Sequence, residues 1–139
     1  MPRDEVNKNI EKLVKIFDME EYIDKKVGGF SKGMKQKTSF ARAIVHNPKF
    51  LLLDEPTSGL DITAINEVHK FIQDSKKEGK TIIFSSHTMS EVQKLCDRVA
   101  ILHKGKIMDI GTQDELKTKY NTELIDNVFE KLVGDSNEV

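Results

Sequence analysis

The feature that most constrains the fold is a run of four apolar residues, Phe50 to Leu53, which ends in Asp54, Glu55 and Pro56. Such a run is typical of a short strand that is covered on both faces of a parallel sheet. Ligands bind at the carboxyl ends of strands in open α/β sheets, so the two acids are candidates for chemistry. A second interpretation stays open here, namely a solvated strand end at which Pro56 stops the pairing.

The residues after this run predict a parallel β-α-β unit. A helix follows, which Asp61 caps and Gly79 ends. Its buried stripe is expected to consist of Ala64, Ile65, Val68, Phe71 and Ile72. A second buried strand is expected at 81–84, directly before Ser85, Ser86 and His87. The alternation of strand and helix indicates parallel pairing.

Two helices are expected before the first strand. Apolar residues at helical spacing predict one from about Asp4 to Asp18. The other begins at Ser31, whose hydroxyl can cap the first turn, and runs to Val45. Gly33 in that first turn costs about 1 kcal/mol against alanine. Either a phosphate must approach the amides at this helix start, or the glycine belongs to an ordinary capped helix.

A short helix is expected after His87, from a capping box of Thr88 and Glu91 to about Cys96. Cys96 is the single cysteine, which excludes an internal disulfide and suits a reducing cytosol. We interpret it as a small buried apolar residue near a helix end.

The pattern then predicts a β-hairpin at 99–110, with Gly105 supplying the positive φ of its turn. Thr112 and Glu115 form a second capping box that opens a short helix. A last amphipathic helix is expected at about 122–133.

The composition is ordinary for a soluble globular protein, with 37% hydrophobic and 32% charged residues in a chain of 139. A chain of this length can bury about two-thirds of its surface. The net charge of -1 argues against nucleic acid as a partner. No signal peptide is recognised, and no apolar run approaches the roughly 20 residues of a membrane-spanning helix. Any work at a membrane is therefore expected to go through a partner, and residues 134–139 are expected to fray.

Taken together, these residues resemble the ATP-binding subunit of ABC transporters over nearly the whole chain. Phe30 to Met34 resembles the signature motif, Phe50 to Asp54 the Walker B strand, and Ser58 to Asp61 the D-loop. Glu55 resembles the catalytic glutamate and His87 the switch histidine. Several motifs in this order are far more specific than any one of them. The form of the signature is most similar to bacterial exporter subunits of the sodium-efflux and drug-efflux kind.

Lys32 and Met34 depart from the usual signature, in which a glycine and a glutamine stand there, whereas Ser31 and Gly33 match it. A P-loop needs a Gly-rich turn that leads through Gly-Lys-Ser or Gly-Lys-Thr into a helix. The nearest string, 79–81, lacks the preceding glycine and leads into a predicted strand. The chain therefore resembles the C-terminal part of one nucleotide-binding domain that lacks its P-loop.

The expected fold class is α/β, a partial P-loop NTPase core of the RecA-like ABC ATPase type with part of its helical subdomain. Within one domain, 1–139, the helical subdomain and signature would occupy about 1–48. Walker B, the D-loop, the switch histidine and the hairpin would occupy about 49–112, and the C-terminal helices about 113–139. In the sheet, the resemblance places the missing P-loop strand between the strand that precedes His87 and the later strand around Ile101. Its absence would leave unpaired edges, which favours strand exchange or a homo-oligomer.

The resemblance also implies ATP and Mg²⁺ as cofactors. Asp54 would hold Mg²⁺ through its hydration shell, and Glu55 would act as the general base toward the attacking water. His87 would bind the γ-phosphate and orient that water. The other histidines match no motif and are expected at the surface: His46, His69 and His103.

In this family two ATPase subunits form a head-to-tail dimer, so part of each site comes from the partner. Ser31 and the amides near Gly33 would bind the γ-phosphate of ATP held by that partner, and Asp61 would cross the same interface. The dimer would drive a transmembrane transporter subunit. The chain would thus be cytoplasmic and peripheral on the inner face of the cell membrane.

Three functions remain open. The first is an ATP-hydrolysing subunit that powers export, with weak ATP affinity and no activity in this chain alone because it lacks the P-loop. The second is a non-catalytic interaction module that folds with a partner. The third is a soluble ABC protein of translation or DNA repair, although such proteins usually carry two cassettes or a coiled-coil insertion.

Overall fold

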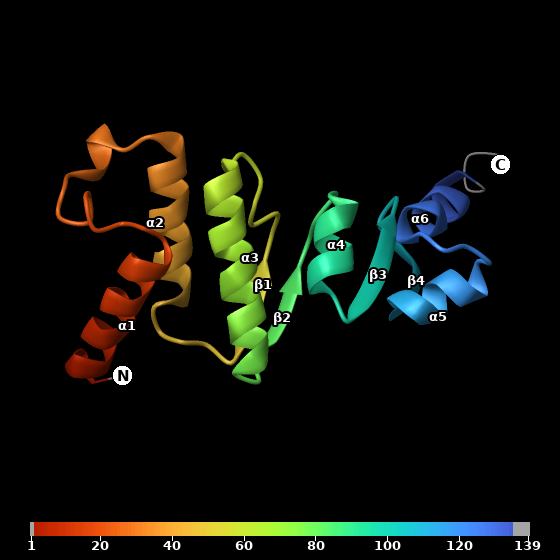
Figure 1. The fold of residues 1–139 in the computed structure, drawn as a ribbon, viewed down its shortest axis with the longest axis horizontal. Coiled ribbons are helices and arrows are strands. Elements are labelled where there is room, and N and C mark those ends of the chain that lie inside the picture. The colour runs from red at the N-terminus through yellow and green to blue at the C-terminus, as the bar shows by residue number, and fades with distance from the viewer. Residues whose placement is uncertain (1, 135–139) are drawn as a thin grey trace. The chain divides into compact units, whose positions relative to one another are not determined.

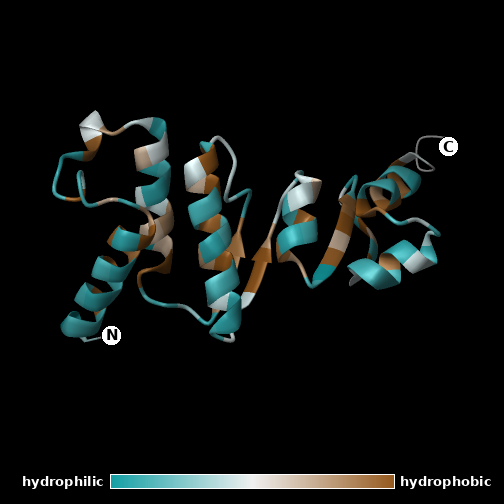
Figure 2. Ribbon diagram, viewed as in Figure 1, coloured by the Kyte–Doolittle hydropathy of each residue, from teal (hydrophilic) through white to brown (hydrophobic). Residues whose placement is uncertain are grey.

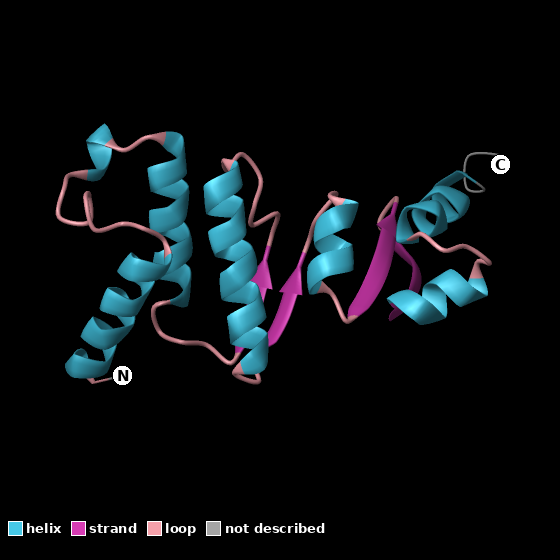
Figure 3. Ribbon diagram, viewed as in Figure 1, coloured by secondary structure: helices cyan, strands magenta, loops and turns pink. Residues whose placement is uncertain are grey.

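The computed structural model describes residues 2–134, in two compact units that divide between Ser85 and Ser86. The first unit contains α1 (Arg3–Ile16), the 3₁₀ helix η1 (Val27–Gly29), α2 (Lys32–Ile44), β1 (Phe50–Leu53), α3 (Ile62–Lys77) and β2 (Thr81–Phe84) (Figure 1). The second contains α4 (Met89–Leu95), β3 (Arg98–His103), β4 (Lys106–Thr112), α5 (Gln113–Lys119) and α6 (Ile125–Gly134) (Figure 3). Residues 135–139, for which fraying is expected, lie outside the described part of the chain.

The predicted β-α-β unit is confirmed. Strands β1 and β2 pair in parallel, beginning with Phe50 opposite Thr81, and α3 connects them. The Asp61 side chain accepts a hydrogen bond from the Ala64 N–H at 2.9 Å, so it caps α3 as expected. Gly79, at φ 79°, follows the helix end, where a left-handed residue is common.

The prediction that both strands are covered on two faces is wrong. In β1, Leu51 and Leu53 are buried, whereas Phe50 and Leu52 are 54% and 73% exposed. In β2, Ile83 is 53% exposed. Neighbouring strand residues point to opposite faces, so the first unit covers only one face of this sheet. Figure 2 shows that both strands are nonetheless hydrophobic.

Aromatic packing connects α1, α2 and α3 in the first unit. Phe17 is fully buried, and its ring lies 5.3 Å from that of Phe40 and 6.0 Å from that of Phe71. The Phe40 and Phe71 rings are 5.5 Å apart, edge to face. Such pairs contribute about 0.5–1.5 kcal/mol each beyond the area they bury. They hold α2 against α3.

The prediction that His69 lies at the surface is wrong, because this residue is only 7% exposed. On α3 it lies beside Val68 and Ile72, which are also buried. The buried face of α3 is therefore wider than the apolar stripe alone predicts. His46 is exposed as expected, and His103 is half-buried.

In the second unit, β3 and β4 form the predicted antiparallel hairpin. Its two-residue turn has Lys104 at φ 46° and Gly105 at φ 77°, as a type I′ turn requires. Helices α5 and α6 pack on the hairpin around a core of Ile101, Leu116, Ile125 and Val128. The capping box of α5 is confirmed, since Thr112 and Glu115 exchange bonds of 3.2 Å and 2.8 Å.

Candidate functional site

The two candidate acids stand where β1 ends, and a serine from the end of β2 connects them. The Ser85 hydroxyl donates to Asp54 Oδ1 at 2.6 Å and accepts from the Glu55 N–H at 2.8 Å. Sequence reasoning treated Ser85 only as the residue after a strand. The parallel register of the two strands is the signal that could have found it. Leu53 lies opposite Phe84, so the residues that follow them, Asp54 and Ser85, are neighbours.

Glu55 has a left-handed backbone, with φ 43°. A non-glycine residue in this region persists only where its surroundings hold it there. Here its N–H is bonded to Ser85, and its carbonyl accepts from the Ser58 N–H at 3.0 Å. The chain thus turns sharply between the acids and the segment that resembles the D-loop.

The start of α2 is capped as predicted, because the Ser31 hydroxyl accepts from the Met34 N–H at 3.2 Å. The Met34 thioether in turn accepts from the Ser31 N–H at 3.5 Å, so the departure from glutamine keeps a capping box. A Cβ at Gly33 would find no atom closer than 4.0 Å. The fold of this chain therefore does not require glycine there. The approach of a phosphate to the backbone amides is the other reason for a glycine at this position.

Residues 58–61, called here the D-loop segment for their resemblance, lie beside α2, called the signature helix because its start resembles the signature motif. Gln36 Nε2 donates to the Ser58 carbonyl at 2.7 Å. Gly59, at φ 72°, faces the end of the Lys32 side chain, and a Cβ there would lie 3.1 Å from Lys32 Nζ. The Lys32 side chain, which stands where the usual signature has glycine, thus lies against Gly59. The structure thus brings the start of α2 next to residues 58–61, although 22 residues separate Gln36 from Ser58.

His87 belongs to the second unit and is exposed. The capping box predicted for the helix after it is wrong: Thr88 is the N-cap residue of α4 but makes no side-chain cap bond. Instead, the Ser86 hydroxyl donates to Glu91 Oε2 at 2.6 Å and accepts from the Thr88 N–H at 3.0 Å. Ser86 thus takes the place expected for Thr88, because its hydroxyl lies within reach of both groups.

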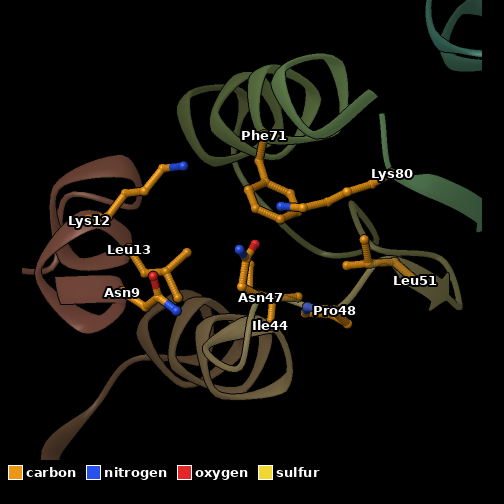
Figure 4. Close-up of a pocket in the computed structure, with 9 residues that line it drawn as sticks. All are labelled: Asn9, Lys12, Leu13, Ile44, Asn47, Pro48, Leu51, Phe71 and Lys80. Carbon is orange, nitrogen blue, oxygen red and sulfur yellow. The ribbon is translucent and has the colours of Figure 1, made fainter. Parts of the chain in front are cut away.

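The string 79–81 is no phosphate loop, as the sequence predicts, because it leads into β2. Lys80 Nζ lies 2.9 Å from Glu78 Oε2 and 6.0 Å from the centre of the Phe71 ring. Figure 4 shows Lys80 reaching over Phe71 at the edge of a small pocket, with Lys12 on its far side. Lys12 Nζ also contacts Glu78, at 3.1 Å, and these two contacts lower the pKa of Glu78. One carboxylate therefore already accepts from both lysines.

The donors at the strand end fit Mg²⁺ chemically. Asp54 offers exposed carboxylate oxygen, the hard ligand that this ion prefers. Within residues 2–134, no group of three histidine, cysteine or acidic side chains could form a metal cage. A magnesium site here would thus consist of one carboxylate with water and phosphate, which is how this ion is usually held.

Comparisons with known proteins bear on the family and the fold of the chain. A family model described as ABC transporter matches residues 2–58. The ABC transporter ATP-binding protein NatA of Bacillus subtilis is 48% identical over 127 residues, which are 91% of this chain and 52% of NatA. The chain belongs to the family of ABC transporter ATP-binding proteins. The family resemblance and the α/β fold class that the sequence predicts are thereby confirmed.

Two further family members support the assignment. The bacitracin transport ATP-binding protein BcrA of Bacillus licheniformis is 42% identical over 79% of this chain and 36% of its own length. A solved structure of an ATP-binding subunit of an ABC transporter superposes with a TM-score of 0.89 and 28% identity, covering 96% of this chain and 56% of the other. The chain thus spans about half the length, or less, of these relatives.

No helix within residues 2–134 is long and apolar enough to cross a membrane. The roles expected for Asp54, Glu55, His87, Ser31, Gly33 and Asp61 remain predictions. Asp61 has one established task in this chain, the cap of α3.

Proposed function

We propose that this chain supplies the catalytic acids and the signature helix of an ATP-hydrolysing subunit that powers export by an ABC transporter. The observation that carries the proposal is the pair Asp54 and Glu55, bonded to Ser85 at the carboxyl ends of two parallel strands. Ligand sites of open α/β sheets lie at that edge. The similarity to NatA and BcrA, both named as ATP-binding proteins of transport, supports the same reaction class.

The residues of the chain divide the work. Glu55 takes a proton from the attacking water as the general base. Asp54 binds the hydration shell of Mg²⁺, which when bound neutralises charge on the phosphates. His87 donates a hydrogen bond to the γ-phosphate and orients the water.

The start of α2 acts on a second ATP. Ser31 and the backbone amides near Gly33 bind the γ-phosphate of ATP held by another ABC ATPase subunit, in a head-to-tail dimer. Asp61 lies at the same interface. The bond between Gln36 and Ser58 connects this helix to the segment that resembles the D-loop. The dimer acts through a transmembrane subunit, on the inner face of the cell membrane.

A non-catalytic interaction module is the second candidate, because the first unit leaves one face of its sheet exposed. Phe50, Leu52 and Ile83 are each more than half exposed on these strands. Apolar surface of this kind is usual where another chain or segment binds. Strand exchange with a second copy of the chain would cover it.

The test uses the protein tagged in its own cells and purified with whatever it binds. We expect Mg²⁺-dependent ATP hydrolysis that Glu55→Gln lowers by about 10²-fold or more, because a general base contributes that much. Glu11→Gln, a change at an exposed acid of α1, is the matched control and should have no effect. Equal turnover in wild type and Glu55→Gln would refute the catalytic proposal and favour the interaction module.

Calorimetry of the 139-residue chain with Mg-ATP completes the test. Because the sequence contains no P-loop, we expect no saturable heat below millimolar nucleotide. Saturation at micromolar nucleotide would mean that another part of this chain binds the phosphates.

A further inference from the structure

We propose that Ser85 is a positioning residue for the reaction: its hydroxyl holds the Asp54 carboxylate and the Glu55 backbone in one arrangement. The inference rests on the proposed function, in which these two acids act on ATP. Ser85 itself would touch neither the nucleotide nor the water.

The position of Ser85 is set by the sheet and not by a mobile loop. Leu53 lies opposite Phe84, and the Ser85 N–H continues the ladder to the Leu53 carbonyl at 3.0 Å. This bond places Ser85 directly beside the turn that begins at Asp54. Groups delivered by paired strands are held more accurately than groups on free loops. The hydroxyl is therefore preorganised before any ligand binds.

The chemistry of the hydroxyl leaves one arrangement. Serine has one proton to donate and two lone pairs that accept. An ionised Asp54 carboxylate only accepts, and the Glu55 N–H only donates. The Ser85 proton must therefore lie on the 2.6 Å bond to Asp54 Oδ1, and a lone pair must receive the Glu55 N–H at 2.8 Å. Because this bond uses Oδ1, we assign Oδ2 to the hydration shell of the metal.

The hydrogen bond from the Glu55 N–H to Ser85 is important because the backbone of Glu55 is strained. Its φ of 43° is unfavourable for a residue with a Cβ, so a released Glu55 would relax toward the right-handed region. That change would redirect the side chain that we assign as the general base. The Ser85 bond restrains the N–H of Glu55, while the Ser58 N–H restrains its carbonyl. Loss of the hydroxyl removes one of these two restraints.

The first experiment measures hydrogen exchange of backbone amides by NMR in the 139-residue chain. In Ser85→Ala the Glu55 amide should exchange about ten-fold faster, because it loses a hydrogen bond of ordinary net strength. Ser85→Thr keeps the hydroxyl and should restore protection. The Ser85 amide, bonded to the Leu53 carbonyl, should be unchanged in both variants, which shows that the strands remain paired. Ser75→Ala, at another buried serine of the first unit, is the control.

The second experiment measures ATP turnover of the tagged protein from its own cells. Ser85→Ala should lower kcat about ten-fold and leave KM for ATP unchanged, whereas Ser85→Thr should restore kcat. Full kcat in Ser85→Ala, while Glu55→Gln is inactive, would overturn the inference and leave the proposed function intact. An equal defect in Ser85→Thr would also overturn it.

If Glu55→Gln retains wild-type turnover, the proposed function is wrong. The positioning role then falls with it, even where the exchange data confirm the hydrogen bond. An unchanged Glu55 exchange rate in Ser85→Ala overturns the inference whatever the turnover.

Discussion

Lys37 connects the signature helix to α3, and its removal should destabilise the first unit. Its Nζ lies 2.8 Å from Glu67 Oε2 on α3, and both side chains are only 16% exposed. The same ammonium donates to the Phe17 carbonyl at 3.0 Å, at the end of α1. The Lys37 ammonium on α2 thus contacts both α3 and the end of α1. We therefore examine Lys37→Met, which keeps the apolar stem and removes the charge.

The expected cost follows from the burial of the pair. Breaking a fully buried pair costs about 3–5 kcal/mol, whereas an exposed pair contributes about 0.2–1 kcal/mol. At 16% exposure, water can reach part of the Glu67 carboxylate in the variant, which reduces the penalty. We expect a loss of about 2 kcal/mol in the free energy of unfolding, close to a 30-fold change in the unfolding constant. Adding Glu67→Leu should recover most of it, because a buried pair can be replaced by apolar groups at little cost.

The assay is urea unfolding of the chain, followed by circular dichroism. Lys35→Met, at an exposed position of the same helix, is the matched control and should change stability by less than about 0.5 kcal/mol. Equal stability of Lys37→Met and wild type would refute the reasoning, as would a double variant that loses the sum of two single effects.

A spectroscopic titration gives an independent measure of the same cluster. Burial raises the pKa of Tyr22 above 10.0, and the nearby carboxylates of Glu67 and Asp18 raise it further. Glu67→Gln should therefore bring the pKa of Tyr22 closer to 10.0. An unchanged tyrosine titration would show that Glu67 does not act on this phenol.

Two further predictions concern the other regions of the chain. Gly59→Ala should destabilise by about 1 kcal/mol in urea unfolding, because φ is 72° there, whereas Gly28→Ala, with open space around it, should be nearly neutral. In the second unit, hydrogen bonds from Lys119 and Tyr120 lower the pKa of Asp109 from 3.8 to about 2. This stabilisation is complete above the unfolded pKa and is lost as the pH falls from about 4 to about 2. Asp109→Asn should flatten acid unfolding followed by circular dichroism in that window, and an unchanged pH profile would contradict the assignment.

Much of the local structure could be predicted from the sequence, because its causes lie a few residues apart. A cap needs only a side-chain oxygen and an amide three positions later, and Ser31, Asp61 and Thr112 all cap as expected. The hairpin turn likewise depends on Gly105 and its neighbour alone. The α/β class and the family follow from the order of such segments and motifs.

The errors arose where the deciding neighbour is distant in sequence. Apolar side chains favour burial, but the sequence does not show whether another element covers them. Phe50 and Leu52 were therefore expected to be buried, and both are exposed. His69 is buried because α3 packs over a wide face, which no spacing within the helix reveals. The capping box at Thr88 was locally plausible and lost to Ser86, whose hydroxyl reaches Glu91.

The candidate site divides in the same way. By itself the sequence determined which residue types stand at the end of each strand and helix, since those patterns are local and periodic. Only the tertiary structure decided that Ser85 joins Asp54 to Glu55, and that Gln36 bonds to the D-loop segment. Partners in these bonds are between 22 and 31 residues apart, and strand register and helix packing alone bring them within hydrogen-bonding distance.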